Sequence, residues 1–185
     1  MKILAFIANG TEDSELVNTI SLLKRAKIDN YLVSVEDLEV MCSHGLKVKA
    51  DAKLSDLSLK ALRDYDGIFI PGGSRGVNTF KNTESLLELI RMYALRGKPI
   101  MAICAGPQVL AKAGIMEGVN FTCYDTCEDE ITMGIYHKDK GAIRDKNIIT
   151  SRSAAYSFDF AYEIIEYLKG KEAVELVKKQ ILLEV

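Results

Sequence analysis

A cysteine, Cys104, ends an apolar run at residues 100–103 and is followed by Ala105, Gly106 and Pro107, which open a stretch of helical pattern. A side chain at such a strand-to-helix corner is exposed on a tight, strained turn that needs small neighbours. The N–H groups and the dipole of the following helix favour a thiolate over a thiol. The spacing therefore predicts a nucleophilic cysteine, and the alternative is a buried, inert core thiol.

An acid, Glu15, stands in the first turn of the first segment with helical periodicity, where it suits the helix dipole. Beside a thiolate, its carboxyl group would have a raised pKa, stay protonated and donate a hydrogen bond to sulfur. Such a pair joins a nucleophile to an acid/base group. The plain alternative is that Glu15, like Glu12 and Asp13, is a solvated acid at a helix N-terminus.

Two glycines, Gly72 and Gly73, follow the apolar part of segment 66–76. Glycine lets the backbone approach a neighbour closely or adopt positive φ. Their N–H groups, together with that of Ala105, would form an oxyanion hole if they faced the carbon attacked by a cysteine. A tight turn with no such role is the alternative.

Strand and helix patterns alternate along the chain and must bring these residues together. Strands are expected at 2–7, 31–35, the start of 66–76, 99–103 and 147–150, with shorter β segments in 40–57 and 121–137. Helices are expected at 14–26, 85–95, 107–113, 157–168 and 171–182. The alternation predicts an α/β fold, a flavodoxin-like three-layer sandwich with a mostly parallel sheet and helices on both faces.

Sites in such sheets form outside the carboxyl ends of the strands. That rule selects the segments 9–15, 71–76, 104–107 and 151–156, which are far apart in sequence. We expect residues 1–185 to form one domain, because no repeat, low-complexity tract or linker interrupts them.

The composition excludes several classes of protein. The chain is 48% hydrophobic and 27% charged, with a formal net charge of -2, so no basic surface suggests nucleic acid. No apolar run approaches the roughly 20 residues of a membrane span, and the N-terminus resembles a core strand more than a signal peptide. The four cysteines lack the density of a secreted disulfide scaffold, which favours a cytoplasmic protein. Cys123 and Cys127 alone make a weak zinc site, so we expect neither metal nor cofactor.

Four motifs together resemble the ThiJ/PfpI superfamily, in the branch of the parkinsonism-associated protein deglycase, which has the class I glutamine amidotransferase-like fold. They are AICAGP (102–107), FIPGG (69–73), NGTEDSE (9–15) and ITSRS with SFDFA (149–153 and 157–161). The resemblance runs from residue 1 to about 183. It implies that Cys104 is the reactive cysteine, Glu15 its protonated partner, and Gly73 and Ala105 the backbone donors that face it.

The same resemblance implies the residues that bind substrate. Arg25 matches an arginine near a dimer interface and the mouth of the site, and Gly72, which precedes Gly73 in the glycine turn, is also expected to bind substrate. His44 stands where the family has arginine, and Tyr124 aligns with a histidine often found near the cysteine. Arg152 lies in Thr-Ser-Arg-Ser-Ala, where the family has Thr-Ser-Arg-Gly-Pro. These departures leave the cysteine chemistry in place and bear on the choice of substrate.

Two related groups differ from this chain at their catalytic histidines. The peptidase-like branch has histidine directly after the nucleophile, where this chain has Ala105. Class I glutaminases use a late His-x-Glu, whereas the last histidine here, His137, precedes Lys138 and Asp139. We therefore expect His137 to be a loop residue and no cysteine–histidine triad to form.

The resemblance implies an enzyme that converts small 2-oxoaldehydes without a cofactor, through a Cys104 hemithioacetal, as a glyoxalase III or deglycase-like lyase or hydrolase. It also implies a homodimer. The alternative from another class is a redox-sensing or chaperone-like stress-response protein, whose Cys104 oxidises to sulfenic and then sulfinic acid. Turnover distinguishes the two, because an enzyme consumes many equivalents of aldehyde and a sensor reacts once with peroxide.

Overall fold

The computed structural model describes residues 1–183 and has a central sheet of seven strands in the order β10-β11-β7-β6-β1-β2-β5. All neighbours in this sheet are parallel except β10 and β11. The strands are β1 (Lys2–Ile7), β2 (Asp29–Ser34), β5 (Ala52–Lys53), β6 (Gly67–Ile70), β7 (Ile100–Ile103), β10 (Ala142–Asp145) and β11 (Ile148–Ser151).

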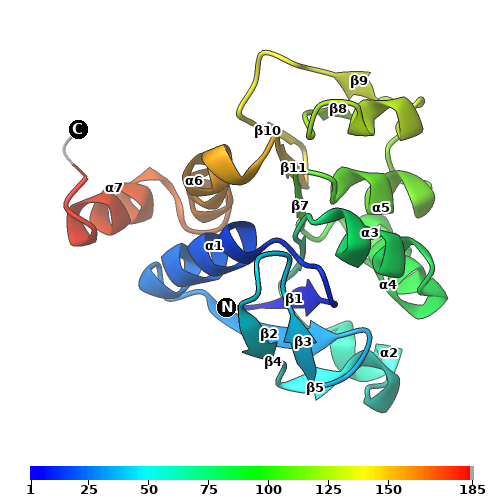
Figure 1. Ribbon diagram of the computed structural model, residues 1–185. Helices are drawn as coiled ribbons and strands as arrows, with labels where there is room; N and C mark the ends of the chain where they lie inside the picture. The colour runs from blue at the N-terminus through cyan, green and yellow to red at the C-terminus, as the bar shows by residue number, and fades with distance from the viewer. Residues whose placement is uncertain (184–185) are drawn as a thin grey trace.

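Helices cover both faces of the sheet, with α1, α6 and α7 on one side and α3, α4 and α5 on the other (Figure 1). The helices are α1 (Asp13–Arg25), α2 (Leu59–Leu62), α3 (Ser74–Lys81), α4 (Glu84–Leu95), α5 (Pro107–Lys112), α6 (Ser157–Lys169) and α7 (Lys171–Gln180). The predicted three-layer, flavodoxin-like α/β class is confirmed. Within residues 1–183, every helix is too short or too polar to cross a bilayer.

Two short strand pairs lie outside the central sheet. β3 (Glu39–Met41) and β4 (Lys47–Lys49) form an antiparallel hairpin, and β8 (Asn120–Phe121) pairs in parallel with β9 (Ile135–Tyr136). Three 3₁₀ turns complete the elements: η1 (Leu54–Asp56), η2 (Cys127–Glu130) and η3 (Ala154–Tyr156). The β3–β4 hairpin matters for the site, because its turn lies against the start of α1.

The central strands are buried on both faces, since successive side chains of a strand point to opposite sides. In β1, Leu4 and Phe6 pack with Phe80 on the α3–α5 side. Ile3, Ala5 and Ile7 pack instead with Phe160 on the side of α1 and α6. The two layers hold β1, β6 and β7 in fixed register, so the residues that follow these strands meet at one edge of the sheet.

Besides the short helix α2 and the 3₁₀ turns, two elements were not expected from the sequence. Helix α3 begins directly after Gly73, although its sequence Ser-Arg-Gly-Val-Asn-Thr-Phe-Lys holds few strong helix formers. Val77 and Phe80 are buried on its inner face, so packing rather than propensity stabilises it. Strand β10 is the second, and it is an edge strand that pairs only with β11 in the described sheet.

Candidate functional site

Cys104 lies at a strand-to-helix elbow, as predicted, in the left-handed backbone region with φ +62. Its N–H donates to the carbonyl of Ser151 at 2.8 Å, and its own carbonyl accepts from the N–H of Tyr124 at 2.9 Å. A non-glycine residue at positive φ is strained and persists only where its surroundings hold it. Hydrogen bonds to β11 on one side and to the 124–127 turn on the other keep Cys104 in this backbone conformation.

Glu15 is fully buried at the start of α1 and reaches the cysteine. Its Oε2 accepts the N–H of Gly72 at 2.8 Å, and its carboxyl group lies beside the Cys104 thiol, while the buried Oε1 has no hydrogen-bond partner among the described residues. Burial raises the pKa of Glu15 to about 7; the adjacent Cys104 thiol and the hydrogen bond from Gly72 oppose this rise, and the nearby charge of Glu12 adds to it. A carboxyl group with this pKa both accepts and donates protons near neutral pH.

The Cys104 thiol also has a raised pKa. Burial is the largest cause and the negative charge of Glu15 the second, while the N–H of Ala105, which donates to the sulfur, opposes them. This differs from the thiolate expected at a helix N-terminus, because burial and a neighbouring acid outweigh one N–H donor. Near neutral pH Cys104 is therefore a thiol, and it faces a Glu15 carboxyl group that is partly ionised and partly protonated.

The glycine pair makes room for this contact. A Cβ on Gly72 would lie 2.5 Å from Glu15 Oε2 and 2.7 Å from the Cys104 Cβ. Gly73 has φ +93, and a Cβ there would lie 2.1 Å from the carbonyl oxygen of Gly10. Both positions thus require glycine, one for close approach of the reactive pair and one for backbone conformation as well as space.

The predicted backbone donors differ in their hydrogen-bond acceptors. The Gly72 N–H is taken by Glu15, whereas the Ala105 N–H points at the Cys104 sulfur. Among residues 1–183, neither the Gly73 nor the Ala105 N–H donates to a backbone carbonyl. Among these three donors, the Gly72 N–H is therefore engaged by the side chain of Glu15, and the Gly73 N–H has no backbone acceptor within residues 1–183.

Replacement of Gly72 by alanine is expected to destabilise the fold, because the added methyl group overlaps both Glu15 and Cys104. We expect a loss of about 1–3 kcal/mol in the free energy of unfolding, measured by urea denaturation. Gly114→Ala is the matched control, since a Cβ there meets nothing within 4 Å and the cost comes only from φ +80. A smaller loss at Gly72 than at Gly114 would contradict the steric account.

Two of the residues expected to bind substrate lie around the cysteine on the 124–127 side. Tyr124 is 53% exposed, and its N–H is bound to the Cys104 carbonyl. Arg152, which directly follows β11, donates through Nη2 and Nε to Asp125 Oδ1 at 2.8 and 3.2 Å. Lys138 Nζ lies 3.7 Å from the other oxygen of Asp125. This ion-paired rim borders the site.

Of the remaining three, Gly72 lies in the glycine turn described above, and His44 and Arg25 lie elsewhere. His44 sits in the turn of the β3–β4 hairpin, with Nδ1 3.3 Å from Asp13 Oδ2 and 3.6 Å from Glu12 Oε1. Arg25 is ten residues after Glu15 on α1, which corresponds to about 15 Å along the helix axis. Within this chain the structure therefore does not bring Arg25 to Cys104. Arg25 instead lines a groove on the outer face of α1.

Glu12 is a residue whose position the sequence reasoning missed. It was expected to be a solvated acid, but its side chain is only 15% exposed and its Oε2 accepts the N–H of Glu15 at 2.6 Å. Glu12 is the N-cap of α1. The signal was available in the sequence, because an acceptor three residues before a first-turn glutamate is the spacing of a capping box.

Glu12, Asp13 and His44 are also the one group of three possible metal ligands that the described residues bring within 4.8 Å of one another. Their oxygens are already occupied: Asp13 accepts the N–H groups of His44 and Leu46, and Glu12 accepts the hydroxyl of Ser14 and the N–H of Glu15. Hydrogen bonds account for the cluster, and we assign it no metal.

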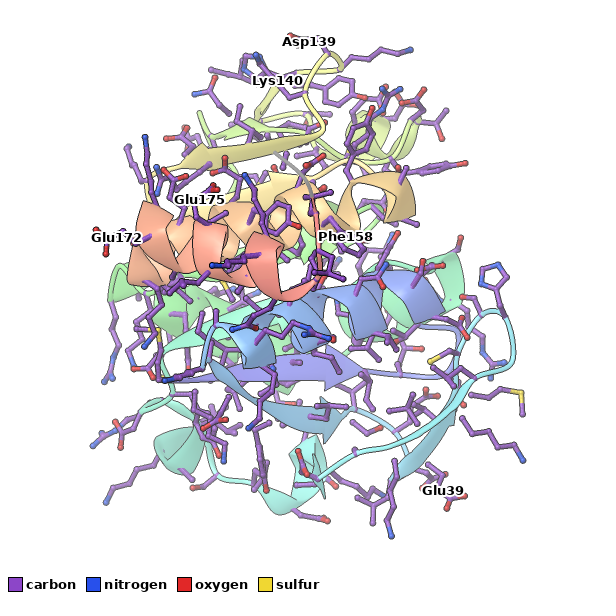
Figure 2. The ribbon with its side chains drawn as sticks, turned by 90° about the vertical axis from the view of Figure 1, so that its left-hand side faces the viewer. Glu39, Asp139, Lys140, Phe158, Glu172 and Glu175 are labelled. Carbon is purple, nitrogen blue, oxygen red and sulfur yellow. The ribbon has the colours of Figure 1, made fainter. Side chains whose placement is uncertain are left out.

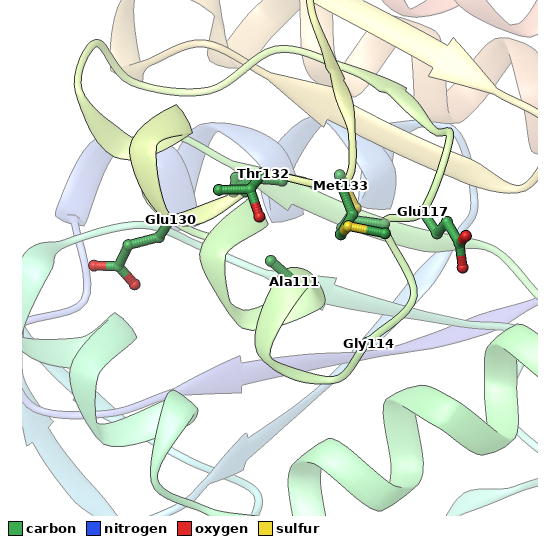
Figure 3. A pocket seen from close by; sticks show the side chains of 8 residues that line it. Ala111, Gly114, Glu117, Glu130, Thr132 and Met133 are labelled. Atoms are coloured by element: carbon green, nitrogen blue, oxygen red, sulfur yellow. The ribbon is translucent and has the colours of Figure 1, made fainter.

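A small cavity of about 170 Å³ lies away from the cysteine, between the end of α5 and the segment 130–133. Figure 3 shows Met133 and Thr132 over Ala111, with Glu117 and Glu130 at opposite ends. Neither Cys104 nor Glu15 lines it. The cavity therefore does not belong to the reactive pair.

The chain is similar over nearly its full length to several characterised sequences. It is 34% identical over 181 residues to Protein DJ-1alpha of Drosophila melanogaster, covering 97% of this chain and 82% of that one. It is 31% identical over 170 residues to Deglycase PfpI of Pyrococcus furiosus, covering 91% of this chain and all of that one.

The fold is similar to that of solved relatives. The crystal structure of Drosophila melanogaster DJ-1beta superposes with a TM-score of 0.89 at 31% sequence identity, covering all of this chain and 98% of that one. An oxidised Toxoplasma gondii DJ-1 gives a TM-score of 0.88 at 30% identity, with 100% and 99% coverage. Residues 1–167 match the DJ-1/PfpI family as a whole. With the cysteine elbow, its buried acid and the glycine turn in place, the chain belongs to the DJ-1/PfpI family.

Proposed function

We propose that this protein is a cofactor-free enzyme that converts small 2-oxoaldehydes to 2-hydroxy acids, with glyoxalase III or deglycase-like activity. The observation that carries the proposal is the buried Glu15–Cys104 pair, in which the pKa of Glu15 is raised to about 7 beside a thiol at a strained elbow. The name of the relative Deglycase PfpI supports a role on aldehydes or their adducts.

The first step joins sulfur to the aldehyde. The ionised Glu15 removes the Cys104 proton as the sulfur attacks the aldehyde carbon, a C–S bond forms, and the π electron pair of the carbonyl moves to oxygen. The N–H groups of Gly73 and Ala105 stabilise this oxyanion. Glu15 then returns the proton to the oxygen, which gives a hemithioacetal.

The second step moves a proton between the two carbons of the adduct. Glu15 removes the proton from the carbon that carries sulfur, and a proton is delivered to the neighbouring carbonyl carbon. The hydroxyl proton of the hemithioacetal moves to the neighbouring carbonyl oxygen, so the adduct becomes a thioester of a 2-hydroxy acid. Water cleaves the thioester and restores the Cys104 thiol. Aldehyde and water give the hydroxy acid, and no oxidant, reductant or cofactor is consumed.

The proposal is tested by counting turnovers. The protein is incubated with glyoxal, methylglyoxal and a bulkier 2-oxoaldehyde, without glutathione, and the 2-hydroxy acid is measured by proton NMR. We expect many equivalents of product per chain, with the smaller aldehydes favoured by the rim of Tyr124 and Arg152. Consumption of a single equivalent of aldehyde with no hydroxy acid released would contradict the proposal and favour the redox-sensing alternative.

We further propose a homodimer that uses the outer face of α1. A groove of about 390 Å³ lies there, lined by Arg25, Val17, Phe158 and the chain after α7. Val17 and Phe158 are 40% and 42% exposed, and Leu182 is 88% exposed. Figure 2 shows Phe158 on this face, beside the end of α7. An isologous contact would bury these apolar side chains and bring Arg25 to an interface.

Val17→Asp is expected to break the dimer, because it places a charge in the centre of the apolar face. Light scattering at micromolar concentration should give twice the 20.5 kDa of one chain for the wild type and a single-chain mass for the variant. Leu95→Asp is the control, since Leu95 is 90% exposed at the end of α4 on the opposite side of the sheet. A single-chain mass for the wild type would overturn the proposal.

A further inference from the structure

A closed ring of three hydrogen bonds links Glu12, Gly72 and Glu15. The N–H of Glu12 donates to the Gly72 carbonyl at 3.0 Å, and the N–H of Gly72 donates to Glu15 Oε2 at 2.8 Å. The N–H of Glu15 donates to Glu12 Oε2 at 2.6 Å and completes the ring. The three hydrogen bonds support one another, so the side chain of Glu12 helps to fix the position of Glu15 relative to the glycine turn.

The Glu12 carboxylate is itself held in place. Ser14 Oγ donates to both of its oxygens, at 3.0 and 2.8 Å, and His44 Nδ1 lies 3.6 Å from Oε1. The hairpin turn that carries His44 is fixed on the same segment, because Ser43 donates to the carbonyls of Thr11 and Gly10. A partly buried carboxylate in such surroundings is a fixed negative charge rather than a mobile surface acid.

We propose that Glu12 is a positioning residue of the reactive pair: its carboxylate holds the first turn of α1 against Gly72, and its charge keeps the proton on Glu15. The inference rests on the proposed function, in which Glu15 passes that proton to and from Cys104 and its adduct. It assigns Glu12 an electrostatic role beyond capping, because any neutral acceptor could satisfy the N–H of Glu15.

The groups around Glu15 make Glu12 the source of this effect. Cys104 contacts Glu15 from the end of β7, and Cys127 influences the pKa of Cys104 but not that of Glu15. The charge of Glu12 raises the pKa of Glu15. Asp13 is adjacent in sequence, but its oxygens accept N–H groups of the hairpin and it is not among the groups that shift the pKa of Glu15. His44 faces both acids and is largely exposed, so water screens it.

The test is the pH dependence of alkylation at Cys104, measured on the full chain with iodoacetamide and mass mapping of the peptide that carries Cys104. Glu12→Gln keeps an oxygen acceptor for the N–H of Glu15 and removes the charge. Glu15 then ionises, and can take the Cys104 proton as general base, at lower pH. We therefore expect the alkylation profile to shift to lower pH by on the order of one unit, which is about tenfold faster alkylation at pH 6. Asp13→Asn is the matched control and should keep the wild-type profile.

A purely structural role predicts other results. It requires the profile of Glu12→Gln to superimpose on the wild type, or Asp13→Asn to shift by the same amount, and either outcome overturns the proposal. Glu12→Ala, which also removes the cap, should lower the melting temperature, whereas Glu12→Gln should not. Alkylation needs no turnover, so a shifted profile supports the role of Glu12 even if the wild type converts no aldehyde, and failure of the proposed function is seen separately.

Discussion

Cys104→Ser is expected to abolish conversion of 2-oxoaldehydes, lowering kcat/KM by about 10³-fold or more, because a serine hydroxyl beside Glu15 is far less acidic and less nucleophilic than the thiol. The backbone at residue 104 should keep its φ of +62, since the hydrogen bonds to Ser151 and Tyr124 use only main-chain atoms. Release of hydroxy acid is followed by NMR, and circular dichroism verifies that the fold is unchanged.

The matched control is Cys127→Ser. Cys127 is a second half-buried cysteine that influences the pKa of Cys104, and its hydrogen bonds run from its N–H to the Tyr124 carbonyl and from the Gln108 side chain to its own carbonyl. We expect it to retain activity within about threefold of the wild type, as for a residue outside the reacting atoms. A Cys104→Ser variant with more than about a tenth of wild-type activity would remove the cysteine from the mechanism.

Glu15→Gln is expected to lower kcat by about 10²–10⁴-fold, because the amide can donate to sulfur and accept from Gly72 but cannot carry a proton between sulfur, oxygen and carbon. The substitution keeps the size of the side chain, and the Gly72 N–H keeps an oxygen acceptor. Rates are measured with the same aldehyde and assay. Activity within a few-fold of the wild type would exclude Glu15 as the acid/base group.

The same substitution should stabilise the protein at alkaline pH. The pKa of Glu15 is about 7 in the folded chain against 4.5 for an ordinary glutamate, so the stability that Glu15 contributes is greatest below pH 4.5 and is lost as the pH rises through 7. At pH 8 the buried charge of Glu15 lowers the free energy of unfolding of the wild type by roughly 3 kcal/mol. A neutral glutamine avoids this loss.

Urea unfolding at two pH values tests this stability difference. We expect Glu15→Gln to exceed the wild type by up to about 3 kcal/mol at pH 8 and to show little or no advantage at pH 4, where the wild-type carboxyl group is neutral in both states. Equal stability at pH 8 would contradict the raised pKa. A variant that is inactive but more stable is the outcome typical of a strained catalytic group.

The sequence predicted the positions of Cys104 and Glu15 better than their surroundings because the two depend on different information. Cys104 stands between an apolar run and Ala105-Gly106-Pro107, and this local pattern determines a sharp elbow. The meeting of Glu15 with Cys104 follows from one topological rule, that parallel strands bring their carboxyl ends to the same edge. Both features were therefore available without coordinates.

Other features depend on how distant segments pack. Helix α3 has a low intrinsic helix propensity and forms because Val77 and Phe80 pack into the core. No local sequence pattern reveals this packing. Which glycine N–H binds Glu15 depends on the path of the chain after β6, and it is Gly72 rather than Gly73. The ionisation of Cys104 could not be predicted from the helix N-terminus alone, since burial and Glu15 act in the opposite direction.

The order of strands also has a consequence for how the chain acquires reactivity as it folds. Glu15 and Gly72 are 57 residues apart, and Cys104 is held from the far side by Ser151 on β11. The pair cannot assemble until β1, β6, β7 and β11 have docked side by side, and such non-local pairing is entropically costly and slow. In a refolding chain, helical circular dichroism should recover before Cys104 acquires its native alkylation rate. Until the sheet closes, the thiol of an incomplete chain behaves as an ordinary cysteine.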